Sequence, residues 1–207
     1  MKKLLLHVCW GALSLMILCS CGAGTAQVKQ ERFHRTGIGV QEKAVILLER
    51  YVYDNRGKDA EEKEQELTDC MREAMVSDGP LIETLSANDF RTTLFPGMKG
   101  ENAPRSSDAL LDLLKKEDVQ NRTSAMTVRY LIVVDIQSSA RRSTFHATVL
   151  DAKNRVRSGK VSSDFIGRAG ANLPILSRTE REACSALGNA VSTFITSAEE
   201  PAPARTQ

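Results

Sequence analysis

Hydrophobic and polar positions are patterned most clearly in the second half of the chain. Residues 128–136 have a continuous apolar centre, which is typical of a strand buried on both faces. In residues 143–150 apolar and polar side chains alternate, which predicts a strand with one buried face. Residues 156–166 continue as a more polar strand near the edge of a sheet. Together these three segments predict an antiparallel meander.

Helical periodicity marks the segments on either side of the meander. Residues 59–77 carry one apolar stripe, made of Leu67, Cys70, Met71, Ala74 and Met75. A final helix is predicted from the capping box Ser177-Arg-Thr-Glu180 to about residue 198. Short apolar runs predict strands at 44–48 and 81–85. Short helices are predicted at 88–94 and from Ser107 onward.

This order of elements predicts a single domain over residues 43–197. The fold class is α+β (α/β sandwich-like), with a mixed sheet of about five strands, a C-terminal antiparallel meander and helices packed on it. Residues 21–42 lack a sustained apolar period and are interpreted as a flexible tether. Residues 198–207, rich in Ala, Pro and Glu, are expected to form a disordered tail.

The N-terminus has the layout of an export signal. Lys2 and Lys3 precede an apolar run that ends at Leu18, so residues 1–20 are interpreted as a secretory signal peptide. The run is shorter than the roughly 20 apolar residues that a membrane-spanning helix needs. An uncleaved anchor and plain secretion with cleavage elsewhere stay open as alternatives.

The stretch Leu18-Cys19-Ser20-Cys21 resembles a bacterial lipobox. The resemblance implies that Cys21 is lipidated and becomes the mature N-terminus, which would attach the protein to the lipid bilayer. Gly22 follows the cysteine. This resembles bacterial lipoproteins that are sorted by default to the outer membrane, whereas Asp at this position would favour retention in the inner membrane. We therefore expect a lipid-anchored protein on the periplasmic face of the outer membrane.

Charge argues against a nucleic-acid partner. Without residues 1–20 the chain has 26 basic and 26 acidic residues, so it lacks the basic excess that attracts nucleic acid. The charges are unevenly spread, with a net −7 over residues 49–89 and +7 over residues 120–181. This asymmetry could mark an interaction surface, or the two regions could neutralise each other as solvated faces of one domain.

Two segments carry a resemblance beyond the lipobox. Val128-Arg-Tyr-Leu-Ile132 and Thr179-Glu-Arg-Glu-Ala-Cys184 are similar to segments of an uncharacterised group of bacterial envelope lipoproteins. The order of elements also resembles that of the α/β domain of curli-secretion-type lipoproteins and of the N-terminal domain of the Tol-system propeller protein. These resemblances imply no catalytic residue.

The sequence contains no recognisable catalytic, metal or cofactor motif, so we expect no enzyme and no cofactor. Four residues are candidates for a ligand or partner surface: Asp135, His146, Gly167 and Gly170. Asp135 ends a buried strand and His146 lies on the polar side of a predicted strand, whereas the two glycines frame a loop before the last helix. The simpler interpretation is that all four are ordinary solvated positions.

Two cysteines remain once Cys21 is lipidated. Cys70 and Cys184 each lie on the apolar stripe of a predicted helix, and an even number in an oxidising compartment is compatible with a disulfide. The alternative is two buried, unpaired thiols that pack as small hydrophobic side chains.

Taken together, the sequence predicts a non-catalytic, membrane-anchored lipoprotein that binds another envelope protein or contributes to an assembly. A small-ligand-binding or hydrolytic domain using Asp135, His146 and the Gly167–Gly170 loop is the alternative.

The first prediction concerns Cys21. Mass spectrometry of the mature protein should find an acylated cysteine at residue 21 as the first residue, and Cys21→Ser should release the domain from membranes or leave the chain unprocessed. Several acyl chains hold a protein firmly because each buried methylene contributes about 0.8 kcal/mol. A wild-type protein that is soluble with a free N-terminus would contradict the prediction.

Overall fold

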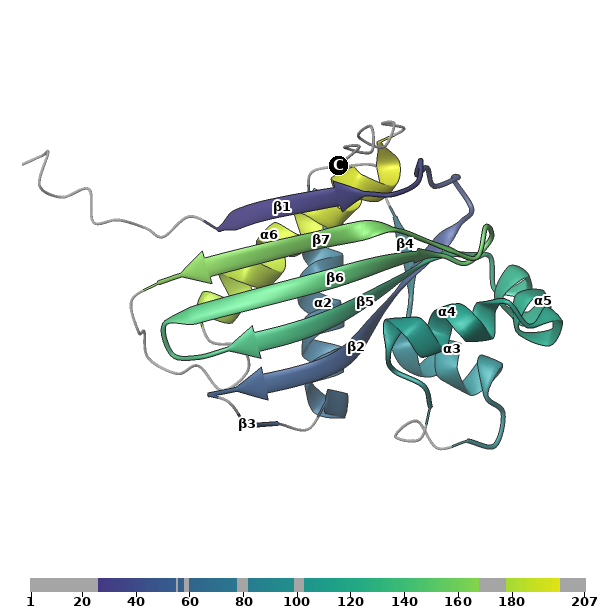
Figure 1. The fold of residues 1–207 in the computed structure, drawn as a ribbon, viewed down its shortest axis with the longest axis horizontal. Coiled ribbons are helices and arrows are strands. Elements are labelled where there is room, and N and C mark those ends of the chain that lie inside the picture. The colour runs from purple at the N-terminus through teal and green to yellow at the C-terminus, as the bar shows by residue number, and fades with distance from the viewer. Residues whose placement is uncertain are drawn as a thin grey trace, which may run out of the picture.

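The fold is one mixed sheet with helices on both faces (Figure 1). The computed structural model describes residues 26–54, 56–57, 60–77, 82–98, 103–167 and 178–197. Within these ranges the strand order is β1-β7-β6-β5-β2-β3, and β4 also pairs with β2. The predicted fold class is confirmed. The strands are β1 (Gln27–Arg32), β2 (Lys43–Tyr53), β3 (Arg56–Gly57), β4 (Glu83–Leu85), β5 (Val128–Ser138), β6 (Arg142–Asp151) and β7 (Val156–Ile166).

The helices cover the two faces unequally. The long helices α2 (Ala60–Ser77) and α6 (Arg178–Thr196) lie side by side across one face. The short helices α3 (Ala87–Leu94), α4 (Ser107–Leu114) and α5 (Glu117–Ala125) gather at one end of the sheet and pack on the other face. None of the helices in the described ranges has both the length and the apolar character that a membrane span requires.

The centre of the sheet is a parallel pair. β2 runs parallel to β5, and β5, β6 and β7 follow one another antiparallel, so the predicted meander is confirmed. Successive residues of β5 point to opposite faces. Ile132 and Val134 are buried against α2 and α6, whereas Leu131 and Val133 are buried against α3, α4 and α5. This double burial explains the continuous apolar run in the sequence.

The structure corrects the expectation that residues 21–42 form only a tether. Residues 27–32 are strand β1, which pairs antiparallel with β7 along its whole length. β7, which was expected near the edge of the sheet, is the strand next to the edge, because β1 lies outside it. β1 is mostly exposed, so no apolar pattern marks it. Backbone pairing with β7 holds it in the sheet, and Gln30 and Arg32 donate hydrogen bonds to backbone carbonyls of α6.

The other boundaries shift by a few residues. β2 extends from Lys43 to Tyr53, beyond the apolar run at 44–48 that predicted it. α3 is capped by Ser86, and not by the Asn88-Asp89 pair that the sequence suggests, and α4 is capped by Ser106, and not by Ser107. Each serine side chain accepts a hydrogen bond from the backbone amide three residues on. The signal peptide, Cys21, Ser177 and the tail at 198–207 lie outside the described residues, so the predictions for them stand untested.

A disulfide joins the two long helices. Cys70 of α2 and Cys184 of α6 are bonded, with their Cα atoms 6.4 Å apart, which confirms the predicted pair over the alternative of two free thiols. The helices also approach closely at Gly188, where an added Cβ atom would lie only 2.7 Å from the Cβ of Ala74. The layer over this face is therefore tightly packed and covalently linked.

A buried ion pair closes the outer edge of β2. β4 pairs with residues 43–45 of β2 and β3 with residues 52–53, and between them no strand of the described residues pairs with this edge of β2. There Glu64 of α2 accepts a hydrogen bond of 2.7 Å from the backbone nitrogen of Leu48. Arg91 of α3 donates to both carboxylate oxygens of Glu64, and both side chains are less than a tenth exposed. The pair joins the two helical layers around the edge of the sheet.

The disulfide should contribute strongly to stability. It joins residues 114 positions apart, for which the chain-entropy model gives about 4–5 kcal/mol. We expect Cys70→Ala with Cys184→Ala to lower the free energy of unfolding by up to this amount in urea titration. Wild-type protein treated with a reducing agent is the matched control and should show the same loss. A urea midpoint that is insensitive to reduction would contradict the prediction.

Candidate functional site

The strand register assembles a polar surface on the half of the sheet that α3, α4 and α5 leave uncovered. We call this surface the open face. Its central row crosses five strands, and each member lies directly opposite the next: Arg50, Asp135, His146, Ser162 and Lys29. Side chains opposite one another on neighbouring strands have Cβ atoms about 5 Å apart, so they form one continuous surface.

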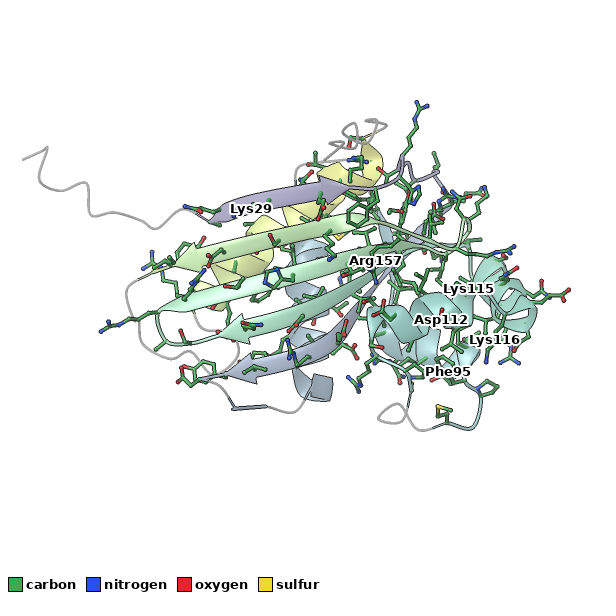
Figure 2. All side chains as sticks on the ribbon, viewed as in Figure 1. Lys29, Phe95, Asp112, Lys115, Lys116 and Arg157 are labelled. Carbon is green, nitrogen blue, oxygen red and sulfur yellow. A yellow bond between two sulfur atoms is a disulfide. The ribbon has the colours of Figure 1, made fainter. Side chains whose placement is uncertain are left out.

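A second row lies nearer to the β5–β6 hairpin. It contains Val52, Gln137, Thr144, Asp164 and Gln27, again in register across the same five strands. The two rows are about 7 Å apart, since alternate residues of a strand share a face. Figure 2 shows Lys29 on β1, away from the end of the molecule where Asp112, Lys115 and Lys116 lie on and beside α4.

Two arginines clasp the two central acids of the open face. Arg50 donates to both carboxylate oxygens of Asp135, at 3.2 and 2.6 Å. Arg142 does the same for Asp164, at 2.9 and 2.5 Å, and Thr144 adds a bond of 3.2 Å to the same carboxylate. The hydrogen bonds from Arg142 hold the pKa of Asp164 below its usual value, although partial burial opposes the shift. Each arginine, in turn, has a raised pKa because of its carboxylate partner.

The surface is hollowed rather than flat. A hollow of about 660 Å³ is bounded by residues that include Arg50, Arg142 and His146. A neighbouring hollow of about 590 Å³ extends toward Glu49 and Lys160. Together they are lined by four cations and four acids, which are Lys29, Arg50, Arg142, Lys160, Glu31, Glu49, Asp135 and Asp164. The open face is thus highly charged but electrically balanced.

The titratable groups of the open face differ in how they are held. A general base needs a carboxylate or imidazole that is free to take a proton and is held in place by a partner. Asp135 and Asp164 are engaged by arginines, whereas Glu49 accepts a hydrogen bond from the backbone nitrogen of Ser107. The exposed His146 side chain forms no hydrogen bond or ion pair within the described part of the chain. The same residues include no group of three or more His, Cys, Asp or Glu side chains that could hold a metal ion.

The structure brings together two of the four candidate residues. Asp135 and His146 are direct neighbours across β5 and β6. Gly167 lies elsewhere, because its nitrogen donates to the carbonyl of Arg141 and an added Cβ atom would meet Phe165, which is packed in the core beneath the helices. Gly170 lies outside the described residues.

Sequence reasoning missed most of the open face. Lys29 was assigned to the tether, and Arg50 follows the apolar run that marked β2. Arg142 and Asp164 lie far apart in the sequence, and only the register between β6 and β7 shows that they meet. The alternation of polar side chains along β7 was the one signal that could have suggested a solvated face there.

Comparison with known proteins does not identify a family. No protein-family model matches the sequence, and no match is found among curated proteins. Solved structures give distant likenesses. PelC from Paraburkholderia phytofirmans, solved as a dodecamer, is 9% identical over 84% of this chain and 100% of its own, with a TM-score of 0.45. TolB from Acinetobacter baumannii is 11% identical over 84% of this chain and 31% of its own, with a TM-score of 0.35.

TolB belongs to the Tol system, whose propeller protein the order of elements also resembles. A single-substitution variant of PelC gives the same TM-score as PelC itself. TM-scores below 0.5 at such low identity support no conclusion about the assembly or activity of this chain. The open face must therefore be interpreted from its own residues.

The clasp on Asp164 predicts a measurable titration. In carbon-detected NMR, the Asp164 carboxylate should titrate below the ordinary aspartate value of about 3.9, and Arg142→Gln should raise its pKa. Because the folded-state pKa is lowered, the pair stabilises the protein above the unfolded-state pKa, and this contribution disappears as the pH falls through the lower folded-state value. Arg50→Gln is the matched control, since Arg50 contacts Asp135 instead. An ordinary pKa for Asp164 in the wild-type protein would contradict the prediction.

Proposed function

We propose that this chain is a membrane-anchored periplasmic lipoprotein whose domain binds another envelope protein through the open face. The observation that carries the proposal is the open face, where mostly polar side chains from five strands form two registered rows. The lipobox at Cys21 supplies the anchor.

The charge balance of the open face supports a protein partner. Four cations and four acids alternate over the two hollows, so the face offers no strong attraction to a polyanion such as nucleic acid. A protein surface with its own alternating charges can match such a pattern, and complementary charges give specificity to an interface. Arg50 and Arg142 are the natural anchors, because interface arginines often carry much of the binding energy.

The shape of the open face also supports a large partner. Small-ligand sites enclose most of the surface of their ligand. Here the hollows lie on the face of a sheet and are bounded by strand side chains such as Thr144 and Ser162. A small molecule would contact them mainly from one side, whereas a folded partner can cover both hollows at once.

A ligand-binding or hydrolytic domain remains the second candidate. It is favoured by one observation, the exposed His146 directly opposite Asp135 at the rim of a hollow of about 660 Å³. For this function Asp135 would have to exchange Arg50 for His146 when a substrate enters. Such an exchange would make Arg50→Gln increase hydrolysis and His146→Ala abolish it.

The proposal predicts site-specific crosslinking in intact cells. A photo-crosslinking amino acid at Ser162, on the open face, should form an adduct with one defined envelope protein, whereas the same group at Val76 of α2 should not. Both positions are accessible, since Ser162 lines the hollows and Val76 is 44% exposed.

Charge reversal tests whether the adduct reflects the open face. Arg50→Glu with Arg142→Glu should lower the yield about tenfold, the size expected from losing an interface arginine. Lys153→Glu, a 70% exposed side chain in the turn after β6, is the control and should leave the yield unchanged. Equal adducts from Ser162 and Val76, or a yield insensitive to both arginines, would contradict the proposal.

A further inference from the structure

The end of the sheet at which β1 begins lies close to the lipid anchor in the sequence. β1 starts at Gln27, only six residues after Cys21. Six residues span at most about 20 Å when fully extended. If Cys21 is acylated, as the proposed function requires, the start of β1 cannot be farther than this from the membrane surface.

The strand register shows which other segments share this end. Gln27 lies opposite Asp164 near the end of β7, and the backbone nitrogen of Gly167 donates to the carbonyl of Arg141 in the β5–β6 hairpin. α6 also begins here, since the hydroxyl groups of Ser143 and Thr179 are 3.0 Å apart. Figure 1 shows the start of β1, the hairpin and the end of β7 together at one end of the sheet, opposite α4 and α5.

We call this end the N-terminal rim and define it by its exposed side chains, which are Gln27, Arg141, Arg142, Ile166, Arg178 and Arg181. Ile166 is 63% exposed, the largest value among the large hydrophobic side chains of β1–β7 and α2–α6. Ile166 lies directly opposite Arg142 across β6 and β7. An apolar side chain beside an arginine suits a bilayer interface, where the apolar group enters the headgroup region and the guanidinium group meets phosphates.

We infer that the N-terminal rim rests on the bilayer that holds the lipid anchor. The contact is modest, because Arg142 is clasped by Asp164 and the exposed acids Asp54 and Glu182 lie at the same end. A modest contact is sufficient, since a short tether keeps the rim at a high effective concentration next to the membrane. The acyl chains supply the attachment, and the rim sets the orientation.

This orientation decides how the open face is presented. The strands leave the rim and run away from the membrane, and α3, α4 and α5 lie at the far end of the sheet. The open face is then parallel to the membrane normal and accessible to a neighbouring protein in the same membrane. The turn at residues 151–154 lies nine residues along β6 from Arg142, about 30 Å away.

Tryptophan fluorescence tests the inference on the mature protein, extracted from membranes after the signal peptide has been removed. Removal of the signal peptide removes Trp10, the only tryptophan, so a single new tryptophan reports on its own position. Ile166→Trp places it on the rim, and Lys153→Trp places it at the far turn. Both side chains are largely exposed, at 63% and 70%, so neither change disturbs the core.

Each protein is reconstituted into vesicles of phosphatidylethanolamine and phosphatidylglycerol that contain a lipid brominated near the headgroup. Bromine quenches only nearby tryptophan. We expect Ile166→Trp to lose fluorescence and Lys153→Trp to keep it. Quenching that is equal for the two variants, or absent from both, overturns the inference.

Mass spectrometry of the same preparations separates this inference from the proposed function. An acylated Cys21 with an unquenched Ile166→Trp overturns the orientation but keeps the anchor. A chain without the acyl group overturns both. An acylated chain in which only Ile166→Trp is quenched supports both.

Discussion

The architecture depends on one point along β2 and β5. Before it, both faces of these strands carry apolar side chains, and after it only one face does. Up to Leu47 and Val133 the two parallel strands bury side chains on both faces. Beyond them, Arg50 and Asp135 occupy the same face and pair with each other. Burying these charges under a helix would cost several kcal/mol per ion. The second helical layer therefore ends where the apolar pattern ends, and the open face begins there.

Two local features fit the strands to this change. A bulge between Leu48 and Arg50 adds one residue to β2, so Glu49 falls at the border between the covered and uncovered parts of the sheet. Its carboxylate accepts a hydrogen bond of 3.2 Å from the nitrogen of Ser107 at the start of α4. On the outer edge, Glu64 takes the place of a neighbouring strand for Leu48. The buried partner Arg91 makes that possible, because an unpaired carboxylate there would be strongly destabilising.

What could be predicted from the sequence follows from burial. β5, the meander and the long helices carry strong apolar periods because they form the core, and Cys70 and Cys184 meet because both lie on stripes that face the same layer. β1 carries no such period, since it is an exposed edge strand that is held by backbone pairing with β7 and by polar contacts of Gln30 and Arg32 with α6. The candidate site follows the same division. Asp135 was expected at the end of a buried strand, whereas β5 continues to Ser138. Its partner Arg50 depends on a register that spacing along the chain does not encode.

The corrected position of β1 changes the meaning of the lipid anchor. A tether reaching residue 42 would let the domain turn freely, because it could span several tens of ångströms. With β1 fixed in the sheet from Gln27, only five residues lie between Cys21 and β1 in the sequence. If Cys21 is lipidated, as we propose, so short a connection restricts which surface meets the membrane. In that case the edge strand couples attachment to orientation, and the proposed orientation turns the open face toward a neighbouring protein in the same membrane.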